Sequence, residues 1–276
     1  MDNNSVKEVA IKKVSEAHVA HADDHVAVEE PLEISLLHGP PGRQSKKVIS
    51  VTMRTPGNDE ELGLGFLFTE GILRDPGQIT RAKVDAQDNS LWISVHPDDE
   101  VFVQNTERNF YTTSSCGVCG KASIDAVHTV SVFPNAPDNI SLNRDVLFQL
   151  TSQLEKKQPF FQQTGGLHAS ALFDLNGNFM LLREDVGRHN ALDKVIGASL
   201  KNKSLPLDDK ILFLSGRAGF ELIQKAWMAG IKIVAAVGAP SSLAIDLANE
   251  SGITLVGFLR NDRFNIYSGS ERITVS

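Results

Sequence analysis

Apolar and polar residues follow two different periods along the chain. In the first part, short runs alternate with period two, which is the period of a strand with one buried face. Such runs predict strands at residues 32–36, 47–53, 82–84, 91–95 and 108–111. Between the second and third of these, Asn58 or Asp59 is expected to cap a helix with acidic residues in its first turn. The mostly apolar run from Leu62 then predicts that this helix is largely buried and ends near Gly71. The first part is therefore expected to be a small α+β unit.

From Thr164 onward, strand and helix patterns alternate. Strands at 167–173 and 178–183 flank Asn176-Gly177, a strong hairpin turn signal. Further strands are predicted at 211–214, 231–237 and 253–258, and helices are predicted to begin at 185–190, 215–217 and 241–242. The order β-β-α-β-α-β-α-β predicts right-handed crossovers and parallel later strands covered by helices.

These patterns divide the chain into three parts. Residues 1–30 are polar and acidic without sustained periodicity, and predict a mobile tail or a short helix. A helix would place His18, His21 and His25 on one face, but no metal site is predicted, because surface tails often carry such clusters without a ligand. Residues 31–160 are expected to form the smaller N-terminal α+β region, including a connector and a helix at 144–156. Residues 161–276 are expected to form a cofactor-binding α/β domain.

Composition narrows the class of protein. The chain has 276 residues, of which 41% are hydrophobic and 22% charged, which suits one large or two modest domains. Its net charge of −7 argues against nonspecific nucleic-acid binding through a basic surface. Neither an apolar run of about 18 residues nor an apolar leader is present in the sequence given, so we expect a cytoplasmic protein without a membrane partner.

Cys116 and Cys119 are the only cysteines in the chain. Gly117 and Gly120 lie beside them, so the pair is expected on an exposed, mobile loop. A structural zinc site is disfavoured because it usually needs a second cysteine or histidine pair. A dithiol redox motif, a structural disulfide and a thiolate that carries sulfur as a persulfide remain open.

Four turns follow strands of the predicted sheet and are therefore expected together at one edge. In sheets of this kind, ligands bind beyond the carboxyl ends of the strands, which is the edge where these turns lie. They are residues 185–190, 215–219, 238–242 and 257–263. The first three meet helix N-termini, which favour anions, and the turns contribute four arginines: Arg188, Arg217, Arg260 and Arg263. We expect this edge, including Ser215, Gly216 and Arg217, to bind a large phosphorylated ligand. His168, Asp185 and His189 are polar residues at the same edge, and a structural role is at least as well supported for each.

The element order resembles the cytidine-deaminase-like fold, a three-layer α/β sandwich. In that fold, a histidine or cysteine at one helix start and a cysteine pair at the next bind catalytic zinc. Here His189 lies at the first helix start, but Ser215-Gly216-Arg217 stands at the second. Zinc-dependent deamination therefore lacks its ligands.

Longer motifs point to a family. Cys116–Gly120, Thr164–Ser170, Arg183–Lys194, Ser215–Arg217 and Gly257–Arg260 together closely resemble the FdhD/NarQ family of formate dehydrogenase accessory sulfurtransferases. The resemblance runs from about Glu33 to Tyr267, and the motif at 183–194 is its most specific part.

The resemblance implies a sulfurtransferase. Such a protein takes sulfur from a cysteine desulfurase and passes it to the molybdenum cofactor, Mo-bis(molybdopterin guanine dinucleotide), before insertion into formate dehydrogenase. It also implies a homodimer. Cys116 would hold the persulfide and Cys119 would relay sulfur or resolve the intermediate, whereas the cofactor site would be lined by Phe258, Leu259, Arg260, Asn261, Asp262 and Arg263. The rival hypotheses are a dithiol oxidoreductase and a guanine-nucleotide-binding regulator without chemistry.

Overall fold

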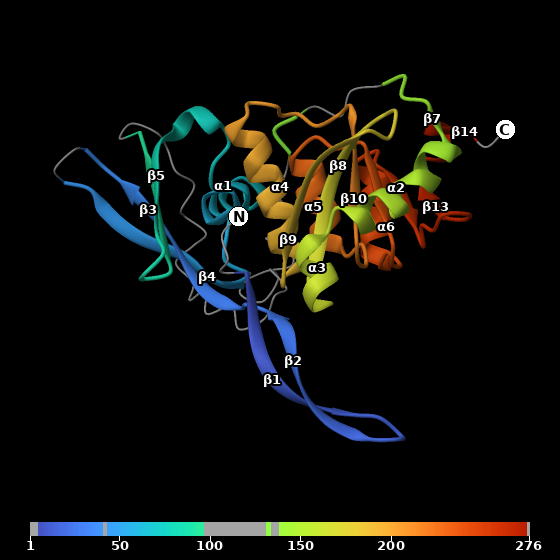
Figure 1. The fold of residues 1–276 in the computed structure, drawn as a ribbon. Coiled ribbons are helices and arrows are strands. Elements are labelled where there is room, and N and C mark those ends of the chain that lie inside the picture. The colour runs from blue at the N-terminus through green and yellow to red at the C-terminus, as the bar shows by residue number, and fades with distance from the viewer. Residues whose placement is uncertain (1–4, 41–42, 97–130, 134–137, 275–276) are drawn as a thin grey trace.

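The computed structural model describes residues 5–40, 43–96, 131–133 and 138–274 of the chain (Figure 1). Two sheets lie on either side of a pair of helices, α1 (Asp59–Thr69) and α4 (Arg188–Lys201). The mixed α/β class predicted from the sequence is confirmed. The likeness to the cytidine deaminase sandwich and the division into three parts stay predictions.

The smaller sheet has four strands: β3 (Glu30–His38), β4 (Ser45–Arg54), β5 (Ile79–Asp85) and β6 (Ser90–Val95). Their order is β4-β3-β6-β5, and β3 and β4 form the predicted antiparallel hairpin. Leu32, Ile34 and Leu36 are fully buried, as the alternation predicted. The strand predicted at 108–111 lies outside the described residues.

The first residues differ from the sequence prediction. In place of a tail or a short helix, β1 (Val6–Val14) and β2 (Val19–Ala27) pair along their whole length as an antiparallel hairpin. This hairpin extends away from the sheets as an arm (Figure 1). Val9 and Ile11 share one face of β1, but charged residues occupy both faces, so the polar and apolar positions do not alternate strictly. Backbone pairing rather than burial of one face defines these strands, and a search for periodicity misses them.

The larger sheet contains six strands in the order β13-β12-β11-β10-β8-β9. In chain order they are β8 (His168–Asp174), β9 (Phe179–Asp185), β10 (Lys210–Leu214), β11 (Ile233–Ala236), β12 (Thr254–Gly257) and β13 (Asn265–Ser268). β8 and β9 form the predicted hairpin, and β10, β11 and β12 are parallel as predicted. The antiparallel edge strand β13 was not predicted.

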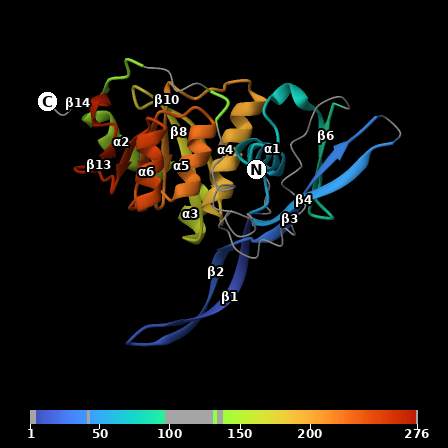
Figure 2. The same cartoon turned by 180° about the vertical axis from the view of Figure 1, so that it is seen from behind.

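Helices cover both faces of this sheet, as the apolar pattern of its strands required. Leu212 and Leu214 pack on the side of α4, α5 (Phe220–Met228) and α6 (Ser242–Glu250), which Figure 2 shows from behind. Ile211 and Phe213 pack on the opposite side, covered by α2 (Arg144–Lys156). Three short elements were not predicted: α3 (Pro159–Thr164) and the parallel pair β7 (Leu142–Asn143) and β14 (Ile273–Thr274).

Helices α1 and α4 cross with almost no space between their backbones. A Cβ at Gly65 of α1 would lie 1.9 Å from the carbonyl oxygen of Asp193, and one at Gly197 of α4 would lie 1.8 Å from that of Glu61. Only residues without side chains allow this approach. The two glycines therefore set how closely the smaller sheet and its helix are held to the larger sheet.

Two helix starts depart from their predicted form. α5 begins at Phe220, so that Ser215 to Gly219 form a loop rather than the first helical turn. Asn58 precedes α1 as predicted, but it adopts a left-handed conformation with φ 58° and its side chain makes no capping hydrogen bond. No helix in the described part of the chain is both long and apolar enough to cross a membrane.

Candidate functional site

The loops that follow the three parallel strands stack against one another, as the sequence predicted. Gly238 N donates to Gly216 O at 2.8 Å, and Phe258 N donates to Gly238 O at 3.1 Å. A Cβ at Gly238 would lie 2.9 Å from Arg217 Cα, so a glycine is required for this close approach. Residues far apart in sequence thus form one continuous rim at the carboxyl edge of the sheet.

The segment 258–263 presents an aromatic ring and charged groups at this rim. Phe258 has φ 53° and is 43% exposed, which is unusual for a bulky residue in both respects. Leu259 is fully buried beneath it. Arg260 Nη1 donates to the carbonyl oxygens of Val237 at 2.8 Å and Leu259 at 2.7 Å, so part of its guanidinium holds the loop together.

The rest of that segment faces solvent. Asn261, Asp262 and Arg263 are exposed, and the Arg263 side chain is 76% exposed. Arg260 N donates to Arg263 O at 2.8 Å, which closes a tight turn. Of the two arginines in this turn, Arg263 is exposed and Arg260 is partly buried. That these residues bind a cofactor stays a prediction.

A second group of polar residues lies where the first turns of α4 and α5 approach the start of β8. We call it the edge cluster, and it comprises His168, Ser170, Arg188, His189, Arg217 and Glu221. His189 Nε2 lies 3.7 Å from Glu221 Oε2, which links the first turn of α4 to that of α5. A Cβ at Gly216 would lie 3.3 Å from His168 Nδ1, so the histidine packs directly on the loop after β10.

The charges in the edge cluster shift the protonation of its members. Burial, and then the charge of Arg188, lowers the pKa of His168 below its ordinary value. The contact with His189 lowers the pKa of Glu221 to about 2. His168 is therefore mainly neutral near pH 7 and Glu221 is ionised, and the cluster carries the two guanidinium groups of Arg188 and Arg217.

Asp185, which the sequence placed at this edge, belongs instead to a buried network. Its Oδ2 lies 2.7 Å from Lys194 Nζ and accepts the N–H of Thr55 at 3.2 Å. Its Oδ1 accepts from Gly187 N at 2.8 Å and from Asn190 Nδ2 at 3.1 Å. Lys194 Nζ also donates to Thr55 O at 2.9 Å. The central residues of the 183–194 motif thus fasten the end of β4 to the larger sheet.

Further ion pairs join the same two parts. Arg183 and Glu61 form a two-pronged pair with distances of 2.6 and 2.9 Å. Lys225 of α5 lies 2.9 Å from Asp193 of α4 and 3.6 Å from Glu70 at the end of α1. Lys225 Nζ and Thr69 Oγ1 are 2.8 Å apart. Several residues of the 183–194 motif therefore hold helices and sheets together, in addition to any role that the motif has at the rim.

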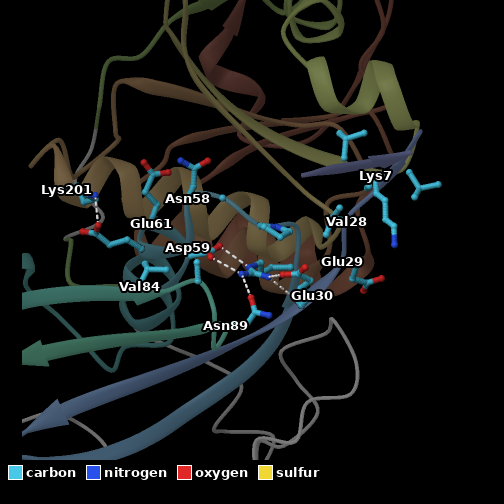
Figure 3. Close-up of a pocket in the computed structure, with 18 residues that line it drawn as sticks. Lys7, Val28, Glu29, Glu30, Asn58, Asp59, Glu61, Val84, Asn89 and Lys201 are labelled. Atoms are coloured by element: carbon cyan, nitrogen blue, oxygen red, sulfur yellow. Dashed lines mark hydrogen bonds and ion pairs between the residues drawn. The ribbon is translucent and has the colours of Figure 1, made fainter. Parts of the chain in front are cut away.

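A large cavity lies elsewhere, between the base of the arm, α1 and the smaller sheet (Figure 3). It has a volume of about 1050 Å³ and is rich in carboxylates. Several of its charges are paired within its own wall: Arg54 contacts Asp59 and Glu30, and Lys201 lies 3.0 Å from Glu60. The acidic first turn of α1 was interpreted from the sequence only as a helix start, and its part in a cavity was missed.

The two cysteines lie outside the described residues, so their predicted roles stay predictions. Within the ranges that the structure describes, no three His, Cys, Asp or Glu side chains are placed to hold a metal ion. Sequence reasoning also overlooked Ser170 and Glu221. Ser170 could have been noticed as a polar residue inside the buried run 167–173.

The sequence of the whole chain, including the cysteine pair, can be compared with known proteins. A family model described as the FdhD/NarQ family matches residues 27–274. The chain belongs to the FdhD/NarQ family. The resemblance drawn from the sequence motifs is thus confirmed, and the match begins at the last residue of the β1–β2 arm.

Members of the FdhD/NarQ family match along nearly the whole chain. The sulfur carrier protein FdhD of Streptomyces coelicolor is 45% identical over 272 residues, covering 95% of this chain and 94% of the relative. That of Mycobacterium tuberculosis is 46% identical over 279 residues, covering 96% and 97%. The crystal structure of a candidate formate dehydrogenase accessory protein from Desulfotalea psychrophila matches with a TM-score of 0.73 and 26% identity, covering 98% of this chain and 99% of that one.

Proposed function

We propose that this protein is a sulfurtransferase that carries sulfur as a persulfide on Cys116. It delivers this sulfur to the molybdenum cofactor, Mo-bis(molybdopterin guanine dinucleotide), before the cofactor enters a formate dehydrogenase. The supporting observation is the match of almost the whole chain to relatives named sulfur carrier proteins. The likeness to a candidate formate dehydrogenase accessory protein supports the proposal that a formate dehydrogenase receives the cofactor.

In the first step, a cysteine desulfurase donates sulfur. The Cys116 thiolate attacks the terminal sulfur of the donor persulfide, a new S–S bond forms at Cys116, and the donor leaves as its own thiolate. Sulfur changes carrier without a net oxidant or reductant. Cys119 either relays the sulfur or resolves the intermediate.

The molybdenum cofactor is the substrate of the second step. The stacked loops at the carboxyl edge of the larger sheet support its proposed site, because strained exposed backbone and solvent-facing arginine are typical of ligand-binding turns. The Phe258 ring supplies a flat apolar surface, and Arg263 supplies a cation. Leu259 and Arg260 hold the turn that presents them, and Ser215, Gly216 and Arg217 form the adjoining loop. We include in the proposal that the protein acts in the cytoplasm as a homodimer.

Mass spectrometry tests the sulfur carrier directly. After incubation with a cysteine desulfurase and cysteine, we expect the protein to gain the mass of one sulfur atom on Cys116. The Cys119→Ala variant is expected to gain it as well, whereas Cys116→Ala is not. A protein that never gains this mass would refute the proposal. Loss of the gain in Cys119→Ala together with a reversible disulfide would favour a dithiol oxidoreductase instead.

A further inference from the structure

One buried hydroxyl in the edge cluster makes no hydrogen bond within the described structure. Ser170 is 1% exposed, and its Oγ has no hydrogen-bond partner there. Alternate residues of β8 pack on opposite sides: Ala171 and Phe173 belong to the α2 side, and Leu172 belongs to the α4 side. Ser170 therefore points toward α4. Buried hydroxyls nearly always have a partner, so this one is an available donor.

The first turn of α4 lies over this hydroxyl. β9 is antiparallel to β8 and leads into α4, so α4 runs in the same direction as β8 and packs on it. Leu192 of α4 and Leu172 of β8 share one apolar cluster, which places the preceding helical turn over Ser170. Arg188 begins that turn, and its Nε is buried without a hydrogen-bond partner in the described part of the chain.

Two helix N-termini meet at this point. α4 has 14 residues and α5 has nine, and glycines precede them as N-caps. Neither Gly187 nor Gly219 supplies a side-chain cap to the first-turn N–H groups. Helix N-termini carry a partial positive charge, and the contact between His189 and Glu221 shows that the two ends are close together.

The charges around the hydroxyl favour an anion. Arg188 and Arg217 both act on His168, which is neutral and has one ring N–H to donate. Of the nearby carboxylates, Glu221 contacts His189 and Asp185 is paired with Lys194. Both of these carboxylates therefore already have partners of their own.

We propose that the edge cluster binds a tetrahedral oxyanion of the phosphate or sulfate class between the first turns of α4 and α5. Ser170 Oγ and Arg188 Nε donate to it, and Arg217 supplies a second cation. This site adjoins the 258–263 turn through Gly238, which bonds to both Gly216 and Phe258. Its anion is either a free inorganic oxyanion or a phosphate group of a nucleotide, and only the second source rests on the proposed cofactor.

Tungstate is a suitable probe because it is tetrahedral, doubly charged and visible by anomalous scattering. Crystals of the full-length protein soaked in sodium tungstate are expected to show a peak within hydrogen-bond distance of Ser170 Oγ and Arg188 Nε. An adventitious ion only, bound on surface residues with the edge cluster unoccupied, would overturn the proposal. So would the absence of any peak at this position.

Titration calorimetry with tungstate measures the same site in solution. We expect Arg188→Gln to lower the affinity about tenfold or more and Ser170→Ala to lower it several-fold, as loss of charged and neutral donors to an anion predicts. Arg81→Gln is the matched control, because Arg81 is exposed on β5 in the other sheet. Equal affinity in Arg188→Gln, Ser170→Ala and the control would refute the proposal. Circular dichroism of each variant verifies folding.

Competition with GDP distinguishes the two sources of the anion. Displacement of tungstate by GDP in the wild type, weakened in Arg188→Gln, assigns the site to a nucleotide phosphate. Displacement by inorganic phosphate but not by GDP assigns it to a free anion, and both results support an oxyanion site. The sulfur mass gain on Cys116 is measured for the same variants. If anion binding fails while Cys116 still gains sulfur, only this inference falls.

Discussion

The buried pair between Asp185 and Lys194 permits a quantitative prediction. Lys194 Nζ lies 2.7 Å from Asp185 Oδ2, 2.9 Å from Thr55 O and 3.4 Å from Glu184 O, and its side chain is 2% exposed. Lys194→Met keeps the length of the side chain but removes the ammonium group. Asp185 then remains as a fully buried carboxylate without a cation.

Breaking a buried pair by removing one partner costs about 3–5 kcal/mol. Asp185 keeps its three N–H donors in the variant, so we expect the lower end, about 3 kcal/mol. Lys201→Met is the matched control on the same helix. Lys201 is also ion-paired, 3.0 Å from Glu60, but its side chain is 41% exposed, and its loss should cost less than about 1 kcal/mol.

Urea unfolding followed by tryptophan fluorescence measures both changes. Trp92 lies on β6 in the smaller sheet and Trp227 lies on α5, so variants that keep one tryptophan report the two parts of the fold separately. Because the network joins these parts, the two transitions should coincide in the wild type and separate in Lys194→Met. If Lys194→Met loses no more stability than Lys201→Met, the network does not hold the two sheets together.

Two further predictions concern packing and pH. Gly197→Ala should lower the free energy of unfolding by more than about 2 kcal/mol despite the better helix propensity of alanine, because its Cβ would meet the backbone of Glu61. Gly63→Ala is the comparison in urea unfolding, since its Cβ would meet side-chain atoms of Leu91 and Ile93 and no backbone atom. An equal loss in both variants would contradict the argument. For Glu221, the folded pKa of about 2 lies below the unfolded value of 4.5, so its contribution is present above pH 4.5 and is lost as the pH falls toward 2. The loss of stability between pH 4.5 and 2 should therefore be smaller in Glu221→Gln than in the wild type, by about 1–3 kcal/mol. The lower figure is expected because the contact with His189 is 3.7 Å long. Identical pH profiles of the two proteins would exclude this role.

Local patterns were sufficient for most of the regular elements. The run of Leu32, Ile34 and Leu36 predicted a half-buried strand, and the Asn176-Gly177 turn predicted the β8–β9 hairpin, because both signals depend only on neighbouring residues. The parallel order of β10, β11 and β12 followed from the alternation of strands and helices. The arm was missed because its strands are defined by pairing with each other and not by a buried face.

The candidate site was predictable only in part. The sequence located the rim loops, since glycines and arginines after buried strands mark the carboxyl edge of a parallel sheet. It could not show that Asp185 and Lys194 face inward, because that depends on where the end of β4 packs.

The sequence by itself determined the family, the strand and helix pattern and the loops at the sheet edge, because these are carried by residues close together in the chain. Tertiary structure alone decided which polar groups are satisfied. Ser170 is buried on the α4 side without a hydrogen-bond partner in the described structure, whereas Asp185 has four. Three of the Asp185 partners are close in sequence, but the fourth, Thr55 N, is brought to it from a segment 130 residues away, whereas Ser170 is buried by a helix that lies over its strand.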